Sequence, residues 1–252
     1  MVDGLAPVVR VLDDPAAAAE AAAERLLGLA DAALHERGRF VLAASGGRTP
    51  EPLYALLGRR RSGSPSWHLF LCDERLVPTE DPRSNLGLLR RLWLGPADFP
   101  DRGVHGVDTS ALPDAAATRY DRTLREFFGP GPGPTFDVAL LGIGPDGHTA
   151  SLFPGSPTLT VRDRWAVAEP SPGLDPQVAR VTLTLPALAR ARHALFLVAG
   201  ADKRSAIDHI LGGGAAPTAS ALPAALVASV GPVEWFLDRP AAGGLQPRPR
   251  SS

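Results

Sequence analysis

Short apolar segments alternate with helix-forming segments along most of the chain, and this order constrains the fold more than any other feature. The first apolar run, residues 8–12, is followed by Asp14 and Pro15, a capping carboxylate and an early helical proline, and then by the alanine-rich segment 16–37. Further strands are expected at residues 39–44, 67–71, 136–141, 165–168, 180–185, 193–199 and 233–237, and helices at 51–61, 84–94, 115–128 and 203–211. Such alternation predicts an α/β fold with a mostly parallel sheet and helices on both faces.

The proline and glycine clusters at residues 129–134 and 212–217 are short, and the α/β pattern continues on both sides of each. We therefore interpret them as loops and expect a single domain over residues 1–238. The segment 239–252 is rich in Pro, Gly, Arg and Ser and has little apolar content. It is expected to be a disordered tail.

Charge and cysteine content exclude several classes of function. The formal net charge is -1 and the sequence pI is about 6.6, which argues against a nucleic-acid partner. Cys72 is the one cysteine, so no disulfide forms within the chain, and a reducing, cytoplasmic location is expected. The first ten residues lack a signal-peptide pattern, and no apolar run approaches the ~20 residues that span a bilayer, so no membrane association is expected.

In parallel sheets ligands bind beyond the carboxyl ends of the strands, so the loops that follow strands are where chemistry is expected. One such loop, residues 45–50, contains Ser45, Gly46, Gly47 and Arg48 at the start of a predicted helix. Its glycines can present backbone amides to a phosphate, although a plain strand-to-helix turn explains the same residues. The loop matches neither the Walker nor the dinucleotide-binding pattern, which disfavours nucleotide hydrolysis and nicotinamide chemistry.

Two further loops place charges at strand ends. Asp73, Glu74 and Arg75 follow the strand 67–71, and Lys203 follows the strand 193–199. Arg75 is suited to bind phosphate and could be oriented by Asp73 or Glu74, while Lys203 could supply a second positive charge. An exposed ion pair and a solvated lysine are the simpler alternatives.

The loop 141–154 carries the strongest signal. It has glycines at 142, 144 and 147 around Asp146 and His148. A histidine that titrates near neutral pH can take a proton from water, and a carboxylate two residues earlier can orient it. We therefore predict that His148 and Asp146 are catalytic, against the alternative of a structural histidine at a loop corner.

The sequence gives little support for a metal site or for a cysteine or serine nucleophile. The six histidines show no paired metal-binding spacing, Cys72 has no evident histidine partner, and no Gly-x-Ser-x-Gly motif is present. We expect no metal and no cofactor.

With these loops assembled, the sequence resembles the 6-phosphogluconolactonase family over nearly its whole length. The resemblance rests on Ser45-Gly46-Gly47 with Thr49-Pro50, Asp73-Glu74-Arg75 with Val77-Pro78 and Ser84-Asn85, the histidine loop through Pro154, residues 180–184, Gly200 with Lys203, and Trp235 with Asp238. It implies a modified Rossmann-like fold and hydrolysis of 6-phospho-D-glucono-1,5-lactone. It also implies that His148 is the general base, and that the Ser45 loop, Arg75 and Lys203 hold the sugar phosphate.

Two departures from the family pattern are visible. Arg48 stands where the family often has a small residue, and it either adds a phosphate contact or points to solvent. Residues 171–176 replace a common lysine-proline stretch, which leaves lid contacts there undefined.

The nearest rival function is that of a glucosamine-6-phosphate deaminase or isomerase, and a non-catalytic sugar-phosphate sensor is a second. The deaminases carry a glutamate five positions after the loop histidine, whereas this chain has Phe153. Because ring-opening isomerisation needs a second acid/base group, this difference favours the lactonase. The expected partner is a small phosphorylated sugar lactone, with the protein a monomer or small homo-oligomer.

Overall fold

The computed structural model describes residues 7–170, 177–212, 222–227 and 231–245. The strands are β1 (Val8–Leu12), β2 (Phe40–Ala44), β3 (Trp67–Leu71), β4 (Asp73–Arg75), β5 (Val104–His105), β6 (Val138–Leu141), β7 (Ala166–Glu169), β8 (Arg180–Leu183), β9 (His193–Val198) and β10 (Val233–Asp238). The α-helices are α1 (Pro15–Arg37), α2 (Glu51–Arg59), α3 (Asn85–Leu89), α4 (Pro113–Phe128), α5 (Leu185–Leu188), α6 (Arg204–Leu211) and α7 (Arg239–Ala242). A π-helical turn, η1 (Arg90–Leu94), extends α3, and a 3-10 turn, η4 (Ala201–Lys203), precedes α6.

Seven strands form one parallel sheet in the order β1-β10-β9-β6-β2-β3-β5. From β2 the chain proceeds outward through β3 to β5, whereas from β6 it proceeds in the opposite direction to β9 and β10. The order therefore reverses between β2 and β6. In open α/β sheets this reversal opens a crevice at the carboxyl ends of the two strands, where ligands bind.

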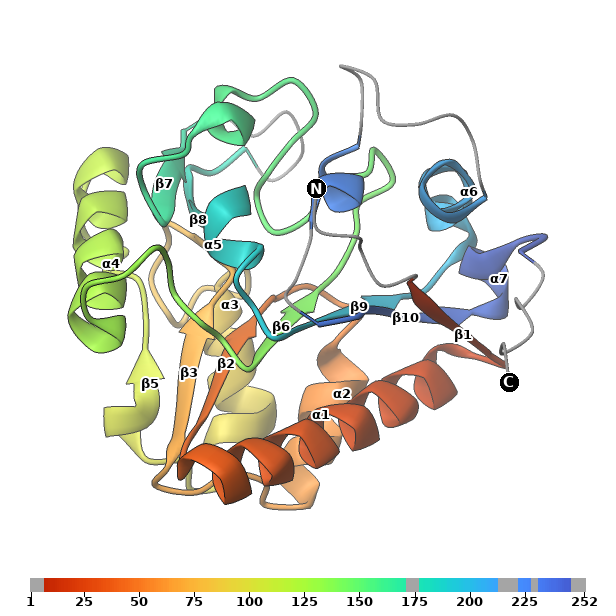
Figure 1. Cartoon of the computed structure of the whole chain (residues 1–252), viewed down its shortest axis with the longest axis horizontal. Helices are drawn as coiled ribbons and strands as arrows, with labels where there is room; N and C mark the ends of the chain where they lie inside the picture. Colours follow the sequence, from red (N-terminus) through yellow and green to blue (C-terminus); the bar gives the residue numbers. More distant parts are fainter. Residues whose placement is uncertain (1–6, 171–176, 213–221, 228–230, 246–252) are drawn as a thin grey trace.

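Helices cover both faces of this sheet, as the alternating pattern predicts. In Figure 1 the sheet is twisted and its strands β9 and β10 are seen nearly edge-on, with α1 and α2 below them and α5 and α6 above. One buried cluster joins the lower helices to inward side chains such as Phe40, Leu42 and Leu69, and a second joins the upper elements to Val41, Phe70 and Phe196. Alternate residues of β2 thus enter opposite cores, so the predicted α/β fold is confirmed.

The first helix begins and ends where its sequence signals place it. The Asp14 carboxylate accepts a hydrogen bond of 2.8 Å from the Ala17 amide, and Pro15 occupies the first turn. At the other end Gly38 adopts a φ of 68° and its amide bonds the Leu34 carbonyl, which closes the helix in a left-handed cap.

A second, three-stranded sheet was not predicted. It contains β4, β8 and β7 in antiparallel order, so that Arg75 is opposite Arg180 and Arg180 is opposite Glu169. The expectation that Asp73, Glu74 and Arg75 lie in a loop is therefore wrong, because these three residues form the strand β4. The strand expected to continue to residue 185 ends at Leu183, where Thr184 caps α5.

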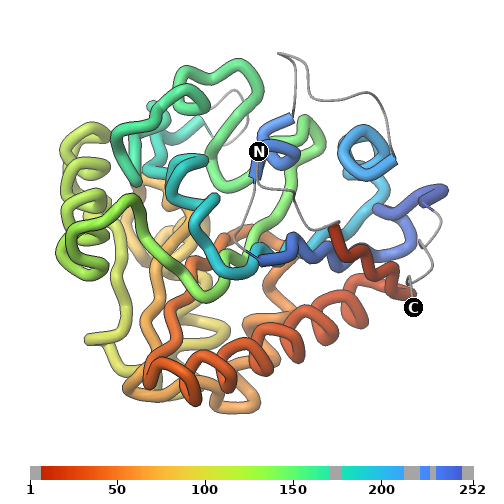
Figure 2. The backbone as a smooth tube through the Cα atoms, viewed as in Figure 1, coloured from red at the N-terminus to blue at the C-terminus, as the bar shows by residue number. Residues whose placement is uncertain are grey.

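The expectation of a disordered tail from Arg239 is wrong for residues 239–245. The Asp238 carboxylate caps α7 by accepting a 2.8 Å hydrogen bond from the Ala241 amide, and Ala241 and Ala242 are buried. Residues 246–252 lie outside the described part. Figure 2 shows the red strand β1 beside the blue strand β10, which ties the two ends of the described chain together. None of the helices in the described ranges is long and apolar enough to cross a membrane.

Candidate active site

A polar pocket of about 220 Å³ opens at the carboxyl ends of β2 and β6, where the strand order reverses. Its walls come from the Ser45 loop, β4, the start of α3, the histidine loop, β8 and η4. Of the residues predicted to act, it contains Ser45, Gly46, Gly47, Arg48, Asp73, Arg75, His148 and Lys203. The fold thus brings together segments that are far apart in the sequence. Asp146 does not line this pocket, but its carboxylate contacts the His148 imidazole.

The Ser45 loop connects β2 to α2 and is held at both ends. The Ser45 amide bonds the Leu140 carbonyl of β6 at 3.1 Å, and the Tyr54 hydroxyl of α2 bonds the Ser45 carbonyl. Gly47 has a φ of 91°, a conformation that favours glycine. Arg48 is exposed at the pocket wall, so both of its expected roles stay open.

The histidine loop holds an Asp-His pair at the pocket edge. Oδ1 of Asp146 lies 2.6 Å from Nδ1 of His148 and also accepts a 3.1 Å hydrogen bond from the His148 amide. This contact assigns the proton of the neutral imidazole to Nδ1 and leaves Nε2 with a free lone pair. The His148 side chain is 20% exposed, so it remains accessible from the pocket. The geometry is that of an oriented proton acceptor.

Close packing at Gly144 fixes this pair. A Cβ at residue 144 would lie 2.0 Å from Nδ1 of His148 and 2.6 Å from Oδ1 of Asp146. The Gly144 amide donates a 2.8 Å hydrogen bond to the His148 carbonyl. The loop can therefore fold over the imidazole only because residue 144 lacks a side chain.

Phe153, five positions after His148, packs against the catalytic candidate. Its ring centroid lies 4.7 Å from that of the His148 imidazole. This neighbour of His148 is therefore an apolar ring that cannot act as an acid or a base.

Among the described residues neither Asp73 nor Glu74 forms an ion pair with the Arg75 guanidinium, although Oε1 of Glu74 accepts a 2.7 Å hydrogen bond from the Arg75 amide. The Asp73 carboxylate accepts a 2.6 Å hydrogen bond from the Ser151 hydroxyl. Glu74 is 1% exposed and accepts hydrogen bonds from the amides of Asn85 and Leu86 at the start of α3, both 2.8 Å. Burial raises the pKa of Glu74, and these backbone hydrogen bonds oppose the rise. Both acids serve the scaffold of the site.

The side chain of Asn85 orients the Arg75 guanidinium, a role that was not predicted from the sequence. Nη1 of Arg75 donates 2.8 Å hydrogen bonds to Oδ1 of Asn85 and to the carbonyl of Arg83. Nε of Arg75 is buried and has no hydrogen-bond partner among the described residues. The guanidinium therefore keeps donor capacity at the pocket wall.

Arg180 is a further cation in the pocket, and from the sequence it was predicted only to be part of a strand. It is 4% exposed, lies across the strand pair from Arg75, and its guanidinium is 5.4 Å from the centre of the Phe153 ring. Burial lowers the pKa of Arg180 and the nearby charge of Arg75 adds to this, whereas Asp73 and Glu169 oppose it. The only sequence signal was a charge within an alternating apolar strand.

Lys203 reaches the pocket from the other side. The Gly200 amide bonds both oxygens of the buried Asp238 carboxylate, at 3.1 and 3.0 Å, which anchors the turn before Lys203. Nζ of Lys203 lies 2.8 Å from the exposed Asp202 carboxylate, and this hydrogen bond is the main cause of a lowered pKa for Asp202. Among the described residues that line it, the pocket thus has four cationic side chains, those of Arg48, Arg75, Arg180 and Lys203, and one carboxylate, that of Asp73.

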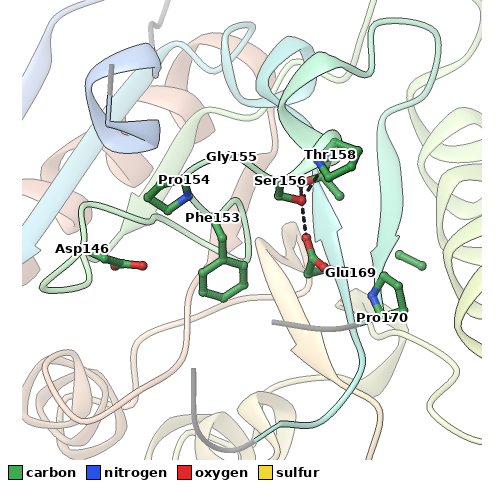
Figure 3. A pocket seen from close by; sticks show the side chains of 10 residues that line it. Asp146, Phe153, Pro154, Gly155, Ser156, Thr158, Glu169 and Pro170 are labelled. Carbon is green, nitrogen blue, oxygen red and sulfur yellow. Dashed lines mark hydrogen bonds between the residues drawn. The ribbon is translucent and has the colours of Figure 1, made fainter. Parts of the chain in front are cut away.

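A larger cavity of about 720 Å³ lies beside the pocket and shares the histidine loop with it (Figure 3). Its lining runs from Asp146 and Phe153 to Ser156 and Glu169, with the Ser156 hydroxyl donating to the Glu169 carboxylate. No lysine or arginine is among its lining residues in the described chain. Because its two acidic groups would repel an anion, the smaller cationic pocket is the better candidate for phosphate despite its size. The lid contacts of residues 171–176 lie outside the described residues.

No group of three or more His, Cys, Asp or Glu side chains suited to hold a metal ion occurs in the described ranges.

The parallel sheet, its helices and the loops at the strand reversal define a Rossmann-like α/β protein. The chain belongs to the glucosamine-6-phosphate isomerase/6-phosphogluconolactonase family, whose sequence model matches residues 13–235. A 6-phosphogluconolactonase from Synechocystis is 41% identical over 218 residues, which cover 85% of this chain and 88% of the relative.

Solved structures agree with this membership. A 6-phosphogluconolactonase from Trypanosoma cruzi superposes with a TM-score of 0.85 at 29% identity and covers 96% of this chain and 98% of its own. A monomeric glucosamine-6-phosphate deaminase superposes with a TM-score of 0.75 at 20% identity, covering 93% of this chain and 98% of its own. Because lactonases and deaminases share this fold, the fold alone does not distinguish the two activities, and the residues of the site must be compared.

Proposed function

We propose that this chain hydrolyses 6-phospho-D-glucono-1,5-lactone to 6-phosphogluconate, a step of the oxidative pentose phosphate pathway, as a metal-independent and cofactor-free enzyme. The observation that carries the proposal is the His148–Asp146 pair, 2.6 Å apart, at the edge of a pocket with an excess of positive charge. The relatives from Synechocystis and Trypanosoma cruzi are both named 6-phosphogluconolactonases.

In this mechanism Nε2 of His148 removes a proton from water as the water oxygen attacks the lactone carbonyl. Asp146 accepts from Nδ1–H and stabilises the imidazolium that forms. The tetrahedral oxyanion then collapses, the bond from the carbonyl carbon to the ring oxygen breaks, and the imidazolium returns the proton to that leaving oxygen. Arg75 and backbone amides of both glycine loops line the pocket, and those that do not hold the phosphate are the candidate donors to the oxyanion.

The phosphate of the substrate binds in the cationic part of the pocket. The backbone around Gly46 and Gly47 supplies amides, and Arg75 and Lys203 supply charge-assisted hydrogen bonds. Arg180 adds a third positive charge beside Arg75. Asp73 does not bind the phosphate itself, since its negative charge would repel that group. Its carboxylate instead accepts hydrogen bonds from Ser151 and Asn85 and so holds their side chains in position.

We also propose that the protein acts in the cytoplasm as a single domain, as a monomer or small homo-oligomer. The rival deaminase is disfavoured by Phe153, whose ring lies 4.7 Å from His148 where a glutamate would stand. The sensor alternative is disfavoured because binding alone does not need an oriented His-Asp pair.

A stopped assay with freshly made 6-phosphogluconolactone, corrected for spontaneous hydrolysis, and a parallel assay with glucosamine 6-phosphate test the proposal. We expect turnover of the lactone and none of the amino sugar. Turnover of glucosamine 6-phosphate alone would establish the deaminase, and turnover of neither substrate would favour the sensor.

A further inference from the structure

Asn85 lies where three parts of the phosphate site meet. It is the first residue of α3, it is 1% exposed, and it lines the same pocket as Gly46 and Arg75. The cap of α3 does not depend on its side chain, because Ser84 is the N-cap residue and Glu74 accepts the first backbone amides. The Asn85 carboxamide is therefore buried at the site for another reason.

The two ends of that carboxamide have different partners. Oδ1 accepts a 2.8 Å hydrogen bond from Nη1 of Arg75, and Nδ2 donates to the backbone carbonyl of Asp73 at 2.8 Å and to its Oδ1 at 3.3 Å. Because Arg75 can only donate and the Asp73 oxygens accept, these contacts fix the orientation of the amide. Asn85 thereby holds the Arg75 guanidinium at a set position relative to β4.

The carboxamide also sets the position of the Ser45 loop. A Cβ at residue 46 would lie 1.9 Å from Oδ1 of Asn85 and 2.2 Å from its Cγ. The backbone of Gly46 is thus in close contact with the group that orients Arg75. One side chain defines the spacing between the amides and the cation that we assign to phosphate.

A neutral amide at this place has an electrostatic consequence. Asp73 and Arg75 are two residues apart on β4, yet among the described residues the Arg75 guanidinium bonds Asn85 and the Arg83 carbonyl and forms no ion pair with Asp73. Instead the Asp73 carboxylate is bonded by Ser151 and Asn85. By lying between the acid and the cation, Asn85 leaves the charge of Arg75 available for an anion.

We infer that Asn85 is a positioning residue of the phosphate site, which acts through Arg75 and Gly46 and not as a base. The inference rests on the proposed function for the identity of the substrate. It predicts that loss of the carboxamide damages phosphate recognition specifically and that the damage depends on Arg75.

A double-mutant cycle with Asn85→Ala, Arg75→Ala and the double variant tests this, with Ser84→Ala as a matched control on the same helix. We expect Asn85→Ala to lower kcat/KM for 6-phosphogluconolactone by ~10-fold or more, mainly through KM, because it removes one charge-assisted hydrogen bond. Unphosphorylated gluconolactone should be affected by less than ~3-fold. In the Arg75→Ala background the further effect of Asn85→Ala should be at most ~3-fold, the part that depends on Gly46, since residues that act together are not additive.

Ser84→Ala removes the hydroxyl that caps α3 but no contact to Arg75, so it should lower the melting temperature and keep the phosphate preference. Asn85→Asp is the same size but sets a carboxylate against the Asp73 oxygens, and it should lose the preference as Asn85→Ala does. Additive effects in the cycle, or equal losses for the two lactones, would overturn the inference.

Failure of the proposed function can be told apart from failure of this inference. If the wild-type protein hydrolyses neither lactone, the proposed function is wrong, and binding of inorganic phosphate by the same set of proteins becomes the readout. Non-additive losses of phosphate affinity would then support the role of Asn85. Additive losses, or no phosphate binding by wild type, would refute it.

Discussion

The substitution Gly144→Ala tests whether the position of the His148 imidazole in the structure matters for activity. The added methyl group would lie 2.0 Å from Nδ1 and 2.1 Å from Cε1 of the imidazole. Ordinary contact begins at 3.4 Å, so the ring must move by about 1.4 Å, the difference between these distances. Since a misplacement of ~1 Å can cost ~100-fold and loss of a general base 10²–10⁴-fold, we expect kcat to fall by ~100-fold or more.

The same loop offers a matched control. A methyl group on Gly142 would meet no atom closer than 4.0 Å, the carbonyl oxygen of Leu197. Neither glycine has a positive φ, so backbone strain does not distinguish the two substitutions. Gly142→Ala should therefore keep kcat within a few-fold of wild type.

Initial rates of lactone hydrolysis and thermal melting curves of both variants complete the test. Overpacking of this kind costs typically 1–3 kcal/mol, so Gly144→Ala should also melt earlier, and activity must be compared where both variants are folded. Equal kcat values for the two folded variants would refute the reasoning, because the imidazole position would then be irrelevant to turnover.

Two further predictions follow from the composition of the site. Arg75→Ala and Lys203→Ala should each weaken the preference for phosphorylated over unphosphorylated lactone by about 1.5–3 kcal/mol, measured as the ratio of kcat/KM values, and equal losses for both substrates would make these residues structural. Strong chelators should leave activity unchanged, because water activation is assigned to His148, and a loss that a divalent ion restores would contradict that assignment.

Much of the large sheet could be predicted because its signals are local. The strands Val8–Leu12 and Trp67–Leu71 have the predicted bounds, and the cap signals of Asp14 and Pro15 place the start of α1. The loops that carry Ser45 and His148 could be found for the same reason, since each directly follows a buried strand. Their meeting at one pocket follows from parallel pairing of those strands.

The missed features depend on pairing between distant residues. The strand β4 has only three residues and exists because it pairs with β8, about a hundred residues later, so nothing local marks it. The roles of Arg180 and Asn85 follow from that pairing and from the packing of α3 against it. The helix α7 is a different case, because a local signal was present. Asp238 and Pro240 resemble the capping aspartate and early proline of α1, but the polar composition of the segment 239–252 led to the prediction of disorder.

The measurement that tests the central claim most directly is the turnover of 6-phosphogluconolactone by wild type and His148→Ala. Spontaneous hydrolysis is subtracted and binding of 6-phosphogluconate is measured beside it. We expect His148→Ala to lower kcat by at least ~100-fold while product binding stays within a few-fold, because the base is lost and the phosphate site is intact. Near-normal turnover by the folded variant would remove His148 from the mechanism and contradict the account.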